Sequence, residues 1–299
     1  MTTLAPTRVA FERILIPTDF STISDNALEY AKRIAKLYHS KLLLAHVNEP
    51  INPVSPPEAV WIDEEEIRQH EVKQLEQCGE RLRAQGLNAK TLLTAGTTHD
   101  ELRSFVEKHQ IDLIVMGTHG RKGLNRFLFG SDTEAVLRRV TCPVLVIGPF
   151  VTVAKNQLWP PKRILCATTL ERDAARVAAY AFMLAHEYHA EFMLFNVENA
   201  ARMSKEEEWL RFESAFRQNL PADIHPDKTM RTLLSDSRPG YKIVEVAKEQ
   251  DADLIVIGAR TASELSTHLL RGTAPQVFSE ATCPVLTLHT EMTENSTQV

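Results

Sequence analysis

Short apolar runs alternate along the chain with longer segments in which apolar residues recur every three to four positions. Arg13–Pro17 and Lys41–Val47 show almost no polar alternation, which is typical of strands buried on both faces of a parallel sheet. Between them, Ser24–His39 has the spacing of a helix with one apolar face. The pattern therefore predicts strands that alternate with helices.

This alternation continues to about residue 147. The expected helices are Asp63–Gln85, Asp100–His109 and Ser131–Arg139, and the expected strands are Ala89–Ala95, Ile111–Met116 and Pro143–Ile147. Right-handed crossovers between parallel strands give a doubly wound sheet, whose ligands bind beyond the carboxyl ends of the strands at the switch point. That rule selects Pro17–Phe20, Val47–Pro50 and Met116–Gly130 as the candidate ligand-binding segments.

The second part of the chain repeats the first. RILIPT from Arg13 returns as RILCAT from Arg163, DLIVMG from Asp112 returns as DLIVIG from Asp253, and TCPVL starts at both Thr141 and Thr282. The first pair is 150 residues apart and the other two are 141 apart. Because the three matches keep their order, we infer a tandem duplication.

The duplication sets the expected domains and fold class. We expect a first domain at residues 1–152, a linker at 153–160 and a second domain at 161–299. The fold class is α/β, with two tandem flavodoxin-like (Rossmann-like) units, each a five-stranded parallel doubly wound sheet.

Composition mainly excludes other classes. Of the 299 residues, 43% are hydrophobic and 24% are charged, as in ordinary globular proteins, and the net charge of −5 argues against a nucleic-acid module. No apolar run approaches the ~20 residues of a membrane span, and the N-terminus lacks the pattern of a signal peptide. The four cysteines form no C-x-x-C pair, so we expect a reduced, cytoplasmic protein without a metal site.

A glycine-rich loop follows the fourth predicted strand. Gly117 is followed after two residues by Gly120, and after nine more by Gly130-Ser131, directly before a predicted helix. Glycines let backbone amides approach a ligand closely, and the first turn of a helix suits a phosphate. An ordinary turn followed by a serine cap would leave the same pattern, so the loop alone does not decide between the two.

The chain resembles the universal stress protein family over essentially its whole length, as two tandem units. The resemblance rests on Asp19 at the end of a strand, on the G-x2-G-x9-G-S loop, and on the closing strand that follows Cys142. In ATP-binding members, the strand-end Asp meets the adenosine, a residue ending the second strand packs on the base, and the loop wraps the ribose and phosphates. The resemblance thus implies an ATP site formed by Pro17, Thr18, Asp19, Val47, Met116, Gly117, Gly120, Gly130, Ser131 and Thr133.

Three further residues of the loop and helix join this candidate site. Asp132 departs from the apolar or small residue usual in the family; it either points outward or caps the helix, or it helps to hold Mg²⁺ beside the phosphates. His119 is either an exposed imidazole or a ligand contact able to act as a general acid or base. Arg121 is either solvated or neutralises phosphate charge.

The second repeat lacks the features that carry this resemblance. Thr169 stands where the first repeat has Asp19, and Thr261 stands where it has Gly120. We therefore expect one nucleotide site, in the first domain. The resemblance also implies pairing through the last strands, here inside one chain as a pseudo-dimer, with a homodimer as a further candidate.

The predicted function is that of a stress-response sensor or regulator that binds ATP or another adenine nucleotide, with an unidentified protein partner. Two alternatives remain open. One is a slow ATPase or phosphotransferase that uses Asp132 or His119, although no Walker loop or nucleophile elbow occurs in the sequence. The other is a nucleotide-independent scaffold whose phosphate site Asp132 has spoiled.

Overall fold

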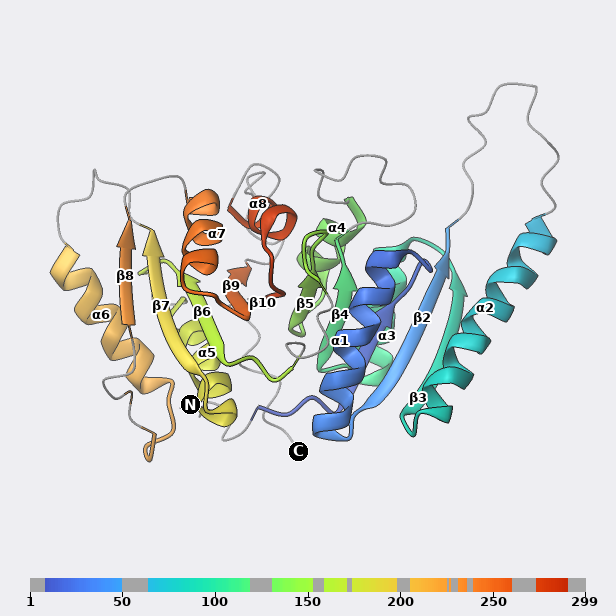
Figure 1. Ribbon diagram of the computed structural model, residues 1–299, viewed down its shortest axis with the longest axis horizontal. Coiled ribbons are helices and arrows are strands. Elements are labelled where there is room, and N and C mark those ends of the chain that lie inside the picture. Colours follow the sequence, from blue (N-terminus) through green and yellow to red (C-terminus); the bar gives the residue numbers. More distant parts are fainter. Residues whose placement is uncertain are drawn as a thin grey trace, which may run out of the picture.

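The computed structural model has two α/β halves with the same order of elements (Figure 1). The first half comprises β1 (Arg13–Pro17), α1 (Thr22–Tyr38), β2 (Lys41–Asn48), α2 (Glu64–Ala84), β3 (Asn88–Ala95), α3 (Thr98–His109), β4 (Leu113–Gly117), α4 (Ser131–Arg139) and β5 (Val144–Ile147). The second comprises β6 (Arg163–Thr168), α5 (Ala174–Tyr188), β7 (Glu191–Val197), α6 (Lys205–Gln218), β8 (Arg231–Ser235), α7 (Pro239–Glu249), β9 (Leu254–Ala259), α8 (Thr273–Glu280) and β10 (Val285–His289). The structure describes residues 9–49, 64–118, 131–152, 159–170, 174–197, 205–224, 226, 231–235, 239–259 and 273–289.

The ends of α1 have local causes. The helix begins two residues before its predicted start, because the side chain of Ser21 accepts a hydrogen bond from the backbone N–H of Ser24 and caps the first turn. It ends at Tyr38 because His39 takes the left-handed conformation, with φ of 55°. α1 therefore reaches closer to the end of β1 than the apolar spacing predicts.

All ten strands form one sheet, in the order β3-β2-β1-β4-β5-β10-β9-β6-β7-β8. Within each half the strands are parallel, so the predicted doubly wound units are confirmed. Their order is 3-2-1-4-5, the Rossmann order, and the flavodoxin order 2-1-3-4-5 does not occur. The crossovers reverse direction between β1 and β4 in the first half, and between β6 and β9 in the second.

The two halves are joined through their last strands, β5 and β10, which lie at the centre of Figure 1. The two strands run antiparallel, with Leu145 opposite Leu286 and Val144 opposite Thr287. Because Leu145 and Leu286 occupy equivalent positions of the repeat, this register relates the halves by an approximate two-fold axis. The pairing expected for an internal pseudo-dimer is present. The boundaries at residues 152 and 160 stay a prediction, since residues 153–158 lie outside the described part.

The hydrophobic core forms two layers, and each layer runs through both halves. On one face of the sheet, α1, α2, α5 and α6 contribute buried residues such as Ile34 and Phe216. On the other face, α3, α4, α7 and α8 contribute residues such as Val136 and Phe278. The strands supply alternate residues to the two layers, which explains why their sequences are apolar throughout.

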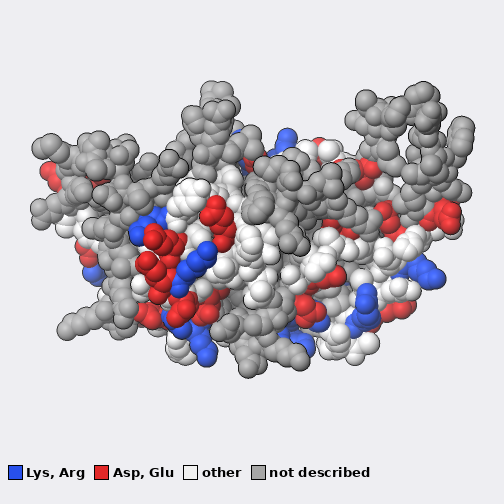
Figure 2. All heavy atoms as spheres, turned by 45° about the horizontal axis from the view of Figure 1, so that its top comes forward, with Lys and Arg blue, Asp and Glu red and all other residues white. Residues whose placement is uncertain are grey.

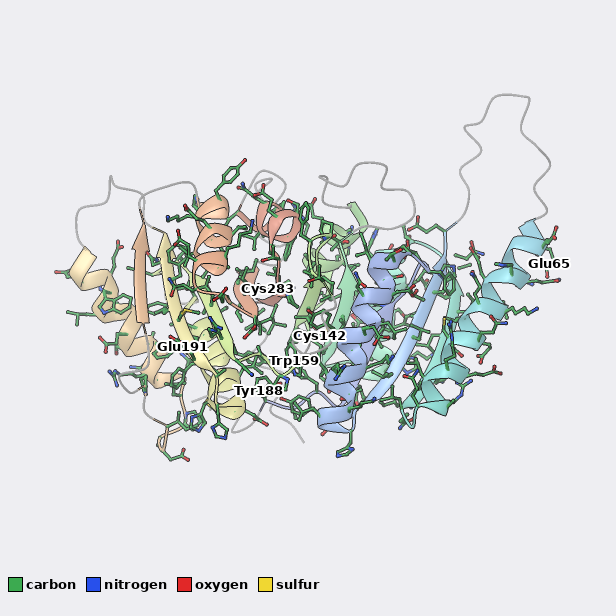
Figure 3. All side chains as sticks on the ribbon, in the orientation of Figure 1. Glu65, Cys142, Trp159, Tyr188, Glu191 and Cys283 are labelled. Carbon is green, nitrogen blue, oxygen red and sulfur yellow. The ribbon has the colours of Figure 1, made fainter. Side chains whose placement is uncertain are left out.

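On the first face, the C-terminal ends of α1 and α5 meet beside the approximate axis. The hydroxyl groups of Tyr38 and Tyr188, which are 150 positions apart in the repeat, hydrogen-bond to each other. Trp159 Nε1 donates to Tyr188 Oη at 3.1 Å, and Figure 3 shows these two side chains close together between the halves. Burial and the neighbouring Tyr38 raise the pKa of Tyr188 above its ordinary value.

None of the described helices combines the length and the apolar content needed to cross a membrane. On the face drawn in Figure 2, acidic and basic side chains are interspersed over the coloured surface. Charge there forms no single-signed area that would by itself indicate a nucleic-acid surface.

Candidate functional site

The candidate site of the first half lies where β1 and β4, neighbours in the sheet, reach their carboxyl ends. β1 ends at Pro17 and is followed by Thr18 and Asp19. The last two residues of β4 are Met116 and Gly117. This is the switch point of the 3-2-1-4-5 order, where doubly wound sheets bind their ligands. The structure therefore brings these five predicted residues to one edge of the sheet.

The two carboxylate oxygens of Asp19 differ in their hydrogen bonding. Its Oδ1 accepts hydrogen bonds from the backbone N–H of Ser21 at 3.1 Å and from Ser21 Oγ at 2.7 Å. Its Oδ2 is buried and has no hydrogen-bond partner among the described residues. A buried polar atom without a partner is costly, so Oδ2 is a ready acceptor for a ligand that brings a donor.

Phe20, directly after Asp19, has a strained backbone. Its φ is 62°, in the left-handed region that costs a non-glycine residue roughly 1 to 2 kcal/mol. Its N–H donates to Thr18 Oγ1 at 3.0 Å, and that oxygen lies 3.2 Å from Ser24 Oγ. The link between β1 and α1 is thus a tight turn, closed by hydroxyl groups on both sides of Asp19.

β2 contributes the half-buried Val47, the residue expected to pack on a base, and also His46. His46 is 7% exposed; its Nδ1 lies 2.7 Å from Thr18 O, and its ring packs on the ring of Phe20 with centroids 4.8 Å apart. Its Nε2 lies 3.5 Å from Oε2 of Glu71 on α2. Sequence reasoning missed His46, although one polar residue in the apolar run KLLLAHV was a signal that could have found it.

The end of β4 is tightly packed. Met116 is buried, and a Cβ added to Gly117 would lie 2.6 Å from Ile23 Cγ2 in the first turn of α1. The glycine is therefore required by the approach of α1, whether or not a ligand is present.

Thr133, in the first turn of α4, is 3% exposed and tied to the end of β4. Its hydroxyl donates to the backbone carbonyls of Gly117, at 3.3 Å, and Thr118, at 3.1 Å. These bonds hold the start of α4 against β4. They also engage the hydroxyl proton that the predicted phosphate contact would need.

The rest of the predicted site belongs to the glycine-rich loop and to the first turn of α4. His119, Gly120, Arg121 and Gly130 lie outside the described residues, and the side chains of Ser131 and Asp132 are likewise not described. α4 does begin at Ser131, as the glycine loop predicts. Within the described part of the chain, no group of three or more His, Cys, Asp or Glu side chains could hold a metal ion.

The second half has the same edge with different chemistry. Asn196, 150 positions after His46, donates through Nδ2 to Thr168 O at 3.0 Å, and its Oδ1 is buried without a hydrogen-bond partner among the described residues. Thr169 replaces Asp19. A Cβ at Gly258 would lie 3.4 Å from Val177 Cγ2, an ordinary contact.

Comparisons with known proteins give a consistent result. The model of the universal stress protein family matches residues 10–148 and again residues 160–289. A universal stress protein of Methanocaldococcus jannaschii is 34% identical over 140 residues, which cover 46% of this chain and 82% of that protein. One from Mycolicibacterium smegmatis is 24% identical over 290 residues, covering 91% of this chain and 95% of that protein.

A solved structure is similar over nearly the whole chain. The crystal structure of a universal stress protein from Archaeoglobus fulgidus superposes with a TM-score of 0.70 at 21% identity, covering 94% of this chain and 97% of that one. At this level of identity the likeness speaks for the fold.

Proposed function

The chain belongs to the universal stress protein family of stress-response proteins, and on this premise we propose that its first half binds an adenine nucleotide, with ATP as the first candidate. The nucleotide lies at the carboxyl ends of β1 and β4. Binding there makes the protein a nucleotide-dependent sensor or regulator, acting in the cytoplasm on a protein partner that the chain does not identify.

The observation that carries the proposal is the buried Oδ2 of Asp19, which has no hydrogen-bond partner within the part of the chain that the structure describes. The two hydrogen bonds from Ser21 to Oδ1 fix the orientation of the carboxylate. They hold Oδ2 in place but do not give it a hydrogen bond. The hydroxyl groups of a ribose and the amino group of adenine are donors that would pair with it. Because this oxygen lies at the switch point of the sheet, a nucleotide fits the position as well as the chemistry.

The phosphates are assigned to the start of α4. The N-terminal turn of a helix offers free backbone N–H groups and a positive dipole end, both suited to phosphate oxygens. Thr133 contributes by anchoring this turn to β4. Gly117, Gly120, Gly130 and Ser131 keep their predicted roles around the ribose and phosphates, and His119, Arg121 and Asp132 are the remaining candidates there, with Mg²⁺ as a candidate ion beside Asp132.

The second half is proposed to be structural. Thr169 provides no carboxylate at the position of Asp19, and Leu170, the equivalent of Phe20, does not have a left-handed backbone. Turnover is not part of the proposal.

A matched pair of variants tests the proposal. Titration calorimetry of the wild-type chain with ATP, together with mass spectrometry of the nucleotide carried by the natively purified protein, establishes whether a ligand binds. Asp19→Ala should weaken ATP binding by about ten- to a hundredfold, the worth of a hydrogen bond to a charged group. Thr169→Ala, the equivalent change in the second half, should leave the affinity unchanged. A wild-type chain that does not bind ATP, or equal losses in both variants, would contradict the proposal.

A further inference from the structure

His46 supplies the hydrogen bond at the point where β1 leaves the sheet. The ladder between β1 and β2 ends at Pro17 and Ala45, and the N–H of Thr18 still donates to Ala45 O at 2.8 Å. The next acceptor, Thr18 O, takes its bond from the His46 ring. Because a carbonyl only accepts, Nδ1 carries the proton. The imidazole therefore holds the last residue before Asp19.

The same ring supports the strained residue on the other side of Asp19. A left-handed phenylalanine persists only where its surroundings determine its conformation, and here the His46 ring packs on the Phe20 ring. The other non-glycine residues with positive φ in the described chain form repeat pairs after helices: His39 with His189, and Gln110 with Asp251. Leu170, the equivalent of Phe20, is not among them. At this pair of equivalent positions, the left-handed backbone is thus found at Phe20 and not at Leu170.

A third side chain lies against the ring. Glu71 lies against the other nitrogen of His46, and the two side chains are 12% and 8% exposed. The ring is therefore bonded to the end of β1, packed on Phe20 and flanked by Glu71 of α2. A side chain held in this way has little freedom and can transmit its position to what it touches.

From these contacts we propose that His46, backed by Glu71, is a positioning residue for the nucleotide site: it sets the Thr18–Asp19–Phe20 turn so that Asp19 Oδ2 faces the ligand. The inference rests on the proposed function for its ligand. His46 itself touches no nucleotide in this arrangement. It acts through Asp19, whose two neighbours in sequence it holds.

Asn196 in the second half provides the natural comparison. It makes the equivalent bond to the end of β6, but Leu170 gives it no aromatic neighbour. His46→Asn should therefore keep the bond to Thr18 O and lose the contacts with Phe20 and Glu71, whereas His46→Leu loses all three. The two variants separate the hydrogen bond from the other contacts.

ATP affinity, measured well below the thermal midpoint of each variant, tests the proposal. His46→Leu should weaken binding about tenfold, His46→Asn should recover to within about threefold of wild type, and Glu71→Gln should cost about two- to threefold. Asn196→Leu, the matched control, should lower the thermal midpoint and leave the affinity unchanged. If His46→Leu does not fold, Phe20→Leu takes its place, with an expected loss of about threefold.

Amide hydrogen exchange in the nucleotide-free chain separates this inference from the proposed function. His46→Leu should speed exchange at Asp19, Phe20 and Ser21. Unchanged exchange there, or unchanged ATP affinity in a folded His46→Leu chain, would overturn the positioning role. A wild-type chain without ATP affinity would overturn the proposed function and the nucleotide part of this inference, while the exchange result would still decide whether His46 holds the turn.

Discussion

At the carboxyl ends of their strands, the two halves share one side-chain-to-backbone hydrogen bond but differ in the residues around it. In each half, a polar side chain of the second strand donates to a backbone carbonyl at the carboxyl end of the first strand: His46 to Thr18 O, just after β1, and Asn196 to Thr168 O, the last residue of β6. The next two positions differ: the first half has Asp19 and the strained Phe20, and the second has Thr169 and Leu170. The duplication kept the bond that closes the strand and changed the groups that would face a ligand.

The opposite edge of the sheet shows no such difference. Asp112 accepts hydrogen bonds from the backbone N–H groups of Glu12 and Arg13, and Asp253 accepts them from Lys162 and Arg163. These carboxylates clamp the starts of β1 and β6. The halves therefore agree at the amino ends of β1 and β6 and differ at the switch point, where doubly wound sheets bind their ligands.

The largest expected effect concerns the clamp of the first half. Burial raises the pKa of Asp112 from 3.8 to about 6, even though the N–H groups of Glu12 and Arg13 act to lower it. A raised folded-state pKa adds stability below the unfolded value, and that stability is lost as pH rises through about 6. The loss amounts to ~3 kcal/mol at most between pH 4 and pH 7. Asp112→Asn should therefore lose less stability than wild type over this interval, as measured by urea unfolding.

The matched variant for the clamp itself is Asp253→Asn, which changes the equivalent carboxylate in the second half. The free energies of unfolding of both variants at one pH show how much stability is lost when an amide oxygen replaces the carboxylate as the acceptor of two N–H groups. Parallel stability curves for wild type and Asp112→Asn across pH 4 to 7 would show that the charge of Asp112 is not costly in the folded state.

Much of this architecture is predictable from the sequence, because strands buried on both faces leave nearly continuous apolar runs. Lys41–Val47 predicts β2 to within one residue, and the repeats predict two copies of one fold. The order of strands is less accessible. Apolar runs do not record on which side of the sheet each crossover passes, so the choice between the Rossmann and flavodoxin orders required the structure.

The site divides in the same way. Asp19 and Gly117 could be found because their motifs are local. The contacts of His46 could not, since Glu71 follows 25 positions later on another element and nothing in the residue type of Phe20 signals a left-handed backbone. Gly117 also carries a packing role that its motif does not reveal, because the motif identifies the glycine without showing that α1 packs against it.

A glycine pair measures that packing role. Gly117→Ala places a Cβ 2.6 Å from Ile23 Cγ2 and 3.4 Å from the carbonyl carbon of Ile23, so α1 must shift, at a cost of about 1 to 3 kcal/mol. Gly258→Ala meets only an ordinary contact with Val177 and should change the free energy of unfolding by less than about 0.5 kcal/mol. Urea unfolding in the absence of nucleotide separates this effect from ligand binding. Equal losses of stability in the two variants would show that the carboxyl ends of β4 and β9 are packed alike.

The junction between the halves, formed by Tyr38, Tyr188 and Trp159, should contribute less to the free energy of unfolding. Tyr38 and Tyr188 are equivalent and bond to each other, but Trp159 donates only to Tyr188, and its counterpart in the first half is Val9. Tyr188→Phe therefore removes two hydrogen bonds, the one with Tyr38 and the one from the indole N–H of Trp159, and should cost about 1 to 2 kcal/mol. Tyr38→Phe leaves Tyr188 bonded to Trp159 and should cost about half as much. Thermal and urea unfolding of both variants decide the matter: if Tyr38→Phe costs as much as Tyr188→Phe, the indole adds nothing and the junction is symmetric in energy as well as in position.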